Sequence, residues 1–77
     1  MYEYGNVNGA EFARRVSKLG KQRGVVVWLD ERHGKGSHAR LYFGTAFTTV
    51  KDRRKEIGKG LLASMLRDLG LSLEDIR

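Results

Sequence analysis

The sequence predicts a small two-layer α+β domain, in which two helices lie on one face of a three-stranded antiparallel sheet. Three observations lead to this class: an amphipathic helical repeat near the N-terminus, three short β-prone runs in the middle, and a leucine-rich helical repeat near the C-terminus. Their order along the chain is α-β-β-β-α. A chain of 77 residues has room for one hydrophobic core, so residues 1–77 are interpreted as a single domain.

The first helix is predicted over residues 9–19. Asn8 precedes it as an N-cap, because its side chain can accept a hydrogen bond from a backbone amide three residues further on. Gly20 follows the helix and is predicted to end it. The preceding residues, 1–7, contain two tyrosines without a clear period and are interpreted as a loosely attached arm. The apolar helix face recurs at helical spacing in Phe12, Val16 and Leu19.

Three strands are predicted over residues 25–29, 38–43 and 46–50, each rich in β-branched or aromatic residues. The first strand is apolar on both faces, so we expect it to be covered on more than one side. The polar segment 30–37 is predicted to be the loop before the second strand. A two-residue Gly-Thr turn is predicted to join the second strand to the third.

Alternation along the strands separates two faces of the predicted sheet. The side chains of the second strand that point toward the helices are Ala39, Leu41 and Phe43. A two-residue turn sets the register of the third strand, because it places the residues that flank the turn opposite each other. The face away from the helices then carries a histidine, an arginine, two aromatic rings and a threonine: His38, Arg40, Tyr42, Phe47 and Thr49.

The C-terminal third begins with a charged link over residues 51–56, which carries four cations in six residues. The second helix is predicted over residues 60–69 and is closed by Gly70 as a C-terminal cap. Residues 71–76 are predicted to form a short final helical turn with Ser72 as its cap. The apolar stripe of the second helix consists of Leu61 or Leu62, Met65, Leu66 and Leu69.

The amino-acid composition limits the kinds of ligand and partner that the protein can bind. Fifteen Lys and Arg against nine Asp and Glu give a net charge of +6, which favours a polyanion such as nucleic acid. The absence of cysteine and the presence of two histidines argue against a zinc site, and no cofactor is expected. No apolar run approaches the roughly 20 residues of a membrane span, and residues 1–5 do not begin a signal peptide, so a cytoplasmic location without a membrane partner is expected.

Residues 34–40, Gly-Lys-Gly-Ser-His-Ala-Arg, concentrate more chemistry than any other stretch. Glycines allow a backbone to come close to a ligand, cations suit a phosphate, and His38 can exchange protons near neutral pH. The stretch therefore predicts contact with a phosphodiester and chemistry on it. The residues expected to contact phosphate or RNA are Lys35, Gly36, Ser37, Arg40 and Tyr42, with Lys51, Arg53 and Arg54 of the charged link.

Four motifs, in order and in spacing, resemble those of the HicA (YcfA-like) family of mRNA interferase toxins. They are Gly-Ser-His at 36–38, Thr-Thr-Val at 48–50, Lys-Glu-Ile-x-Lys-Gly at 55–60 and Gly-Leu-Ser-x-Glu-Asp at 70–75. The resemblance spans essentially the whole chain. One departure follows the first helix, where the family usually has a Gly-Trp pair and this chain has its tryptophan only at Trp28.

The resemblance implies a fold similar to that of double-stranded-RNA-binding domains, in agreement with the order read from the residues. It also implies the toxin component of a type II toxin–antitoxin module. Such a toxin is an endoribonuclease that cleaves messenger RNA and is held inactive by a HicB-type antitoxin. On this resemblance, activity depends on His38, and Trp28 belongs either to the core or to the antitoxin-facing surface.

RNA carries its own nucleophile, the 2′-hydroxyl, so cleavage needs groups that move protons and groups that hold the phosphate. We expect His38 to act as the general base or acid, with Lys35 and Arg40 on the scissile phosphate and no metal ion. His33 is a candidate for the second proton transfer. The expected products end in a 2′,3′-cyclic phosphate and a 5′-hydroxyl.

Two other functions stay open from the sequence: a non-catalytic RNA-binding module of the same fold, and a protein-interaction domain whose basic patch docks an acidic partner. Individual residues have alternatives as well. Tyr42 and Phe47 either stack on bases or stiffen the sheet. Ser37 either contacts RNA or caps the loop, and the cations of the link either follow an RNA backbone or face solvent.

Overall fold

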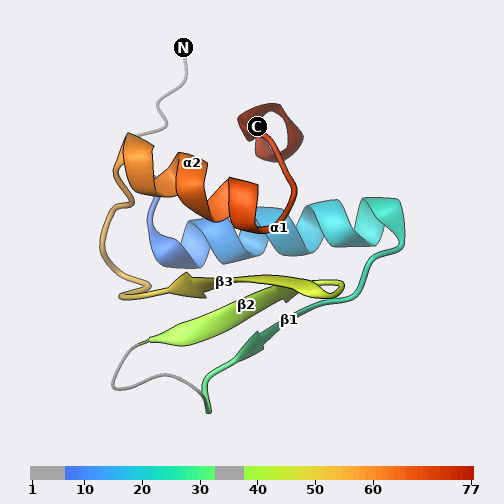
Figure 1. The fold of residues 1–77 in the computed structure, drawn as a ribbon, viewed down its shortest axis with the longest axis horizontal. Helices are drawn as coiled ribbons and strands as arrows, with labels where there is room; N and C mark the ends of the chain where they lie inside the picture. The colour runs from blue at the N-terminus through green and yellow to red at the C-terminus, as the bar shows by residue number, and fades with distance from the viewer. Residues whose placement is uncertain (1–6, 33–37) are drawn as a thin grey trace.

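The computed structural model describes residues 7–32 and 38–77. Its two helices cover one face of the sheet and leave the other face open (Figure 1). The predicted α+β class and the α-β-β-β-α order are therefore confirmed. In chain order the elements are α1 (Gly9–Arg23), β1 (Val27–Asp30), β2 (Ala39–Phe43), β3 (Ala46–Val50), α2 (Lys59–Asp68) and the 3-10 helix η2 (Leu73–Ile76).

The sheet is antiparallel throughout, in the order β1-β2-β3. Tyr42 lies opposite Phe47 on one side and opposite Trp28 on the other. The turn between β2 and β3 has two residues, as predicted, and its Gly44 adopts a φ of 65°. Glycine adopts this positive φ without strain because it has no Cβ atom. The register predicted for β2 and β3 is therefore confirmed.

Helix α1 begins as predicted, since the Asn8 side chain accepts a hydrogen bond of 2.8 Å from the Glu11 amide. Its predicted end at Gly20 is wrong, because the helix continues to Arg23 and Gly24 caps it with a φ of 69°. Gly20 instead serves close packing. A Cβ on Gly20 would lie 2.3 Å from Cγ2 of Val27, so glycine at this position lets the chain entering β1 pass directly against the helix.

Strand β1 differs from its prediction in both its bounds and its environment. It covers Val27–Asp30 rather than residues 25–29. The expectation that it is covered on more than one side is wrong, because Val26 is 73% exposed and Trp28 is 44% exposed. The helices cover only one face, so the outward apolar side chains of this strand face solvent. The core assignment of Trp28 is thereby excluded.

Asp30, predicted to lie in the loop, is the last residue of β1 and is buried. A buried carboxylate is stable only when hydrogen bonds replace its lost water. Its Oδ1 atom accepts hydrogen bonds from the backbone amide of Arg32 at 2.9 Å and from the Arg32 side chain at 3.2 Å.

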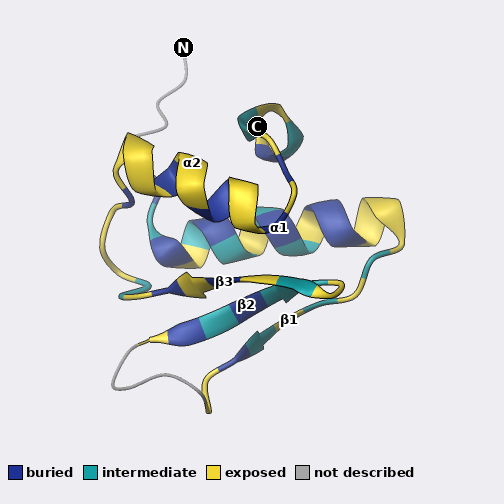
Figure 2. Ribbon diagram, in the orientation of Figure 1, coloured by how far each residue is buried: buried dark blue, intermediate teal, exposed yellow. Residues whose placement is uncertain are grey.

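The core lies between the sheet and the two helices, and Figure 2 shows the buried residues on their facing surfaces. Val7 belongs to this core at 2% exposure, and its carbonyl accepts a hydrogen bond from the Ile57 amide at 2.8 Å. The predicted arm therefore does not include Val7, and its other residues, 1–6, lie outside the described part of the chain. Of the two alternatives in α2, Leu62 is buried and Leu61 is exposed.

The C-terminal predictions hold to within one residue for α2, which is Lys59–Asp68 rather than 60–69. Gly70 has a φ of 72°, and the amides of Gly70 and Leu71 bond to the carbonyls of Arg67 and Leu66. This pair of hydrogen bonds is the Schellman arrangement that ends a helix at a glycine. The cap predicted at Ser72 is also present, and it forms a capping box with an aspartate in η2. Within residues 7–32 and 38–77, no helix is long and apolar enough to cross a membrane.

Candidate nucleic-acid interface

His38 lies immediately before β2 and is exposed. The last pair of the β2–β3 ladder is Ala39 with Val50, so His38 and Lys51 are the next residues along the two strands. Both line one cavity of about 370 Å³. Lys55 lines the same cavity, which therefore brings an imidazole and two ammonium groups to one hollow of the surface.

The other described residues that line this cavity include two carboxylates, a glycine and four apolar side chains. Asp52 and Glu56 come from the link, and Gly9 comes from the beginning of α1. A phosphate in the cavity would meet charges of both signs, so its position would be set by the two lysines rather than by a uniform field. The apolar lining consists of Val50, Ile57, Leu61 and Met65.

Hydrogen bonds to the first turn of α1 hold the link in place. The Gly9 amide donates to the Lys55 carbonyl at 3.3 Å, and the Ala10 amide donates to the Arg53 carbonyl at 2.9 Å. A Cβ on Gly9 would lie 2.8 Å from the Cα of Arg53, so the close approach requires glycine. These contacts position Lys55, and they use amide groups that a helix N-terminus could otherwise offer to an anion.

A row of side chains crosses the open face of the sheet, and we call it the aromatic ladder: Trp28, Tyr42 and Phe47, with Arg40 at its end. The rings of Trp28 and Tyr42 are stacked, with centroids 4.6 Å apart and planes 7° apart. Tyr42 and Phe47 are 5.5 Å apart and tilted by 47°. The guanidinium carbon of Arg40 lies 4.6 Å from the Phe47 ring centroid, which is cation–π geometry.

Arg32 adds a second guanidinium close to this face. A hydrogen bond with Asp30 and the charge of that carboxylate raise the pKa of Arg32, and the nearby Tyr42 adds a smaller effect in the same direction. The Arg32 side chain is 80% exposed. The guanidinium of Arg32 therefore pairs with the buried carboxylate of Asp30 and still has most of its surface in solvent, beside the aromatic ladder.

The structure places the predicted site residues in two groups. His38 and Lys51 share the cavity, whereas Arg40 and Tyr42 lie on the open sheet face, as their alternation predicts. The remaining loop residues that the sequence nominates lie outside the described part of the chain: His33, Lys35, Gly36 and Ser37.

The cations of the link have different surroundings. Arg53 forms an ion pair with Glu31, with 2.8 Å between Nη1 and Oε2, and so ties the link to the segment after β1. The Arg54 side chain is 94% exposed, and its Nε lies 3.9 Å from a carboxylate oxygen of Asp52. The predicted RNA contacts of both arginines stay predictions, and Arg54 is the more accessible of the two.

Sequence reasoning missed two members of the interface. Lys55 belongs to the predicted cation run, but only the hydrogen bonds between the link and α1 bring it to the cavity of His38. Trp28 lies in an unbroken apolar run, in which alternation gives no signal. The structure pairs Trp28 with Tyr42, and residues opposite each other in a sheet share a face.

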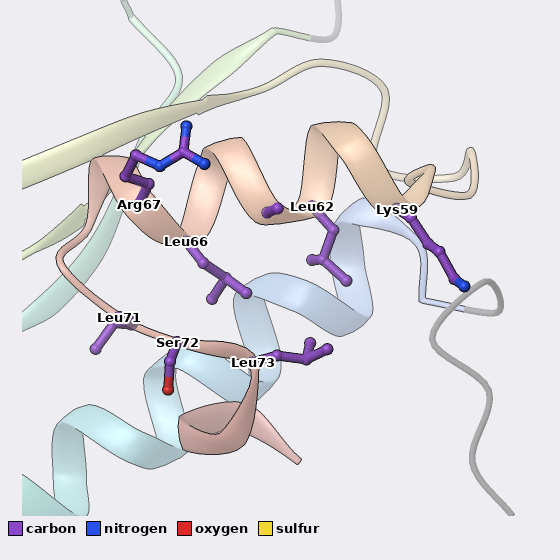
Figure 3. A pocket seen from close by; sticks show the side chains of 8 residues that line it. Lys59, Leu62, Leu66, Arg67, Leu71, Ser72 and Leu73 are labelled. Carbon is purple, nitrogen blue, oxygen red and sulfur yellow. The ribbon is translucent and has the colours of Figure 1, made fainter.

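A larger cavity of about 520 Å³ lies between α2 and the segment leading into η2 (Figure 3). Leu62, Leu66 and Leu73 point into it, while the charged ends of Lys59 and Arg67 point away from its centre. The described residues that line it include no imidazole and no carboxylate. Its described lining therefore offers no histidine or acid for proton transfer, and we do not take it as the candidate site. Within the described ranges, no group of three His, Cys, Asp or Glu side chains could hold a metal ion.

Comparison with known proteins finds no match: no family model, no curated protein and no solved structure. What the interface does must therefore be inferred from its own residues and their arrangement.

Proposed function

We propose that the protein is a HicA-like endoribonuclease, the cytoplasmic toxin component of a type II toxin–antitoxin module. The observation that carries the proposal is the exposed His38 beside Lys51 and Lys55 in one cavity. An imidazole that can transfer a proton, beside residues whose cations suit phosphate, supplies one of the two proton transfers and the charge stabilisation that metal-independent RNA cleavage needs. The four motifs and the net charge of +6 support the same function.

In the proposed reaction, the 2′-oxygen of a ribose attacks the adjacent phosphorus and the bond from phosphorus to the 5′-oxygen breaks. His38 either removes the proton from the 2′-hydroxyl or delivers one to the departing 5′-oxygen, and a solvent water makes the complementary transfer. Lys51 and Lys55 balance the negative charge that grows on the phosphoryl oxygens. The products are a 2′,3′-cyclic phosphate and a 5′-hydroxyl, so no water is consumed in this step.

The proposed protein partner is a HicB-type antitoxin that holds the enzyme inactive. The excess of basic residues favours an acidic inhibitor, because opposite charges accelerate and orient association. Addition of such an antitoxin is expected to suppress cleavage at a one-to-one ratio of active sites.

A second candidate function is a non-catalytic RNA-binding module of the same fold. The aromatic ladder favours it, because exposed rings interleaved with a guanidinium can bind bases without any chemistry. The two functions differ in what His38 contributes. Binding survives the loss of one exposed imidazole, whereas proton transfer does not.

The deciding experiment incubates the purified protein with labelled single-stranded RNA in EDTA and identifies the product ends. We expect the wild type to cut and to leave cyclic phosphate ends, and we expect His38→Ala to lose about 10²- to 10⁴-fold in rate, the usual contribution of one acid–base group. The matched control is Gln22→Ala, another exposed residue near the far end of α1, about 20 Å along that helix from the cavity.

Two outcomes would overturn the ribonuclease proposal. Equal RNA binding without cutting by the wild type and by His38→Ala would favour the binding module. Equal cutting by both proteins would remove His38 from the reaction. Circular dichroism spectra of each variant show whether the fold is intact.

A further inference from the structure

We propose that the open face of the sheet is a binding site for unpaired bases of single-stranded RNA, in which a base stacks on the indole of Trp28. The inference rests on the proposed function for RNA as the ligand and adds the strandedness of the substrate and the surface that holds it. It concerns the aromatic ladder, which is separate from the cavity of His38.

The ladder is held rigid by the sheet beneath it. Trp28, Tyr42 and Phe47 are direct cross-strand neighbours, one from each strand. The inward neighbour Leu41 is 1% exposed and fixes the central strand to the core. Rings fixed in this way lose little conformational freedom when a ligand binds, so a stacked base retains more of its binding energy.

Trp28 offers the open position of the ladder. One face of its indole packs against Tyr42 with nearly parallel planes. Because β1 is an edge strand, the opposite face of the indole is directed beyond the edge of the sheet, and the residue is 44% exposed. A base added there would continue the stack that the protein has already begun.

The charges around the ladder favour nucleic acid over another apolar partner. Arg40 lies against the ring at one end, and the guanidinium of Arg32, which pairs with Asp30, is still largely exposed close to Tyr42. Rings interleaved with cations bind bases through their faces and the backbone through its phosphates. In a duplex the bases are paired and stacked on one another, so only unpaired bases can offer a free face to Trp28.

One residue of the ladder, Tyr42, lies in the strand that follows His38 of the cavity. Tyr42, Arg40 and His38 follow one another at every second residue, so Tyr42 is about 13 Å along the strand direction from His38. A strand of RNA with one base on the ladder can therefore extend past Arg40 toward His38. In this arrangement the ladder holds one part of the substrate while His38 acts on a phosphodiester further along the same backbone.

Trp28 is the only tryptophan of the chain, so its fluorescence reports directly on the proposed contact. The probe is a short oligoadenosine with 2′-O-methyl groups, which lacks the nucleophile of the proposed cleavage and stays intact. We expect it to quench the fluorescence in a saturable way. A duplex of the same length and an abasic oligonucleotide with the same phosphates are expected to quench little, because neither offers a free base.

Variants test the same contact through affinity, measured by fluorescence anisotropy of a labelled probe. Trp28→Ala is expected to bind about tenfold more weakly, the size of one lost base–aromatic stack. Trp28→Phe keeps a ring and is expected to recover most of that loss. Val26→Ala removes another exposed apolar side chain two residues away and is the matched control, with an affinity close to that of the wild type.

Absence of quenching, or wild-type affinity in Trp28→Ala, would overturn the inference. A change of Trp28 fluorescence with protein concentration in the absence of RNA would also overturn it, since that change would show that the face binds a second copy of the chain. The proposed catalytic function fails separately. RNA cleavage with wild-type binding in Trp28→Ala overturns only the stacking site, whereas quenching without any cleavage overturns only the ribonuclease.

Discussion

The two faces of one sheet have opposite environments, although the same three strands supply both. On the inner face, Leu41 and Val50 are each 1% exposed and pack in the core with residues of both helices. On the outer face, Trp28 and Phe47 are more than 40% exposed, and each packs against the Tyr42 ring of the central strand. The inner face therefore stabilises the fold, and the outer face is free to serve binding. Substitutions on the two faces should separate stability from RNA affinity.

The largest effect is expected for Leu41→Ala on the inner face. Truncation of a fully buried leucine removes apolar contacts and leaves a cavity, which costs about 2–5 kcal/mol of unfolding free energy. For a domain of this size, that is a large part of the total stability. Urea unfolding followed by circular dichroism measures it. A loss below about 1 kcal/mol would show that the inner face is less tightly packed than its burial indicates.

The packing between α1 and the chain entering β1 provides the next test. Gly20→Ala is expected to cost about 1–3 kcal/mol, because the added Cβ would lie 2.7 Å from the Val25 carbonyl oxygen, which is backbone and cannot turn aside. The matched control is Gly60→Ala in α2, where a Cβ meets nothing within 4 Å.

That control should stabilise the protein by about 0.4–1 kcal/mol, since alanine narrows the unfolded ensemble and favours helix. Thermal unfolding of both variants compares their changes in stability. Equal shifts in the two variants would contradict the close contact at Gly20.

On the outer face, Phe47→Ala should lower RNA affinity more than it lowers stability. Its ring contributes cross-strand packing worth about 0.2–1 kcal/mol, so the unfolding free energy should fall only slightly. RNA affinity should fall severalfold, because the variant removes the ring under Arg40 and one member of the ladder. Urea unfolding and probe anisotropy, measured on the same preparation, separate the two effects. A stability loss as large as that of Leu41→Ala would remove the distinction between the faces.

The contrast between the faces also shows what sequence reasoning could reach. Alternation and the Gly-Thr turn sufficed to assign Leu41 inward and Tyr42 outward, because period and turn length are local properties. Trp28 could not be assigned in the same way. Its neighbours are apolar on both sides, and only the position of β1 relative to the helices decides which side is buried.

Glycines illustrate the same limit at the end of α1. The sequence predicts the end of the helix at Gly20, but Gly20 is used for packing and Gly24 caps the helix. The candidate site was likewise predictable from the sequence only in part. His38 could be nominated from its motif, but the cavity it shares with Lys55 depends on amides of α1 that hold the link. Contacts between segments far apart in sequence decided both outcomes.

The smallest effect is expected from an exposed ion pair on the solvent side of α1. Hydrogen bonds from Arg14 and Arg15, followed by their charges, lower the pKa of Glu11 from 4.5 to about 2. A carboxyl whose pKa is lower in the folded state stabilises the fold above its unfolded pKa and loses that contribution on protonation. The contribution of Glu11 is therefore complete above about pH 5 and disappears as the pH falls from 4.5 toward 2.

Glu11→Gln has no carboxyl group to titrate at position 11, so its unfolding midpoint should depend less on pH than that of the wild type over this window. At neutral pH the two proteins should differ only slightly in stability, because water screens exposed ion pairs. Urea unfolding at a series of pH values measures the difference. Parallel pH profiles would show that the arginines hold Glu11 equally in the unfolded chain, and that the solvent side of α1 adds no pH dependence to the stability set by the inner face of the sheet.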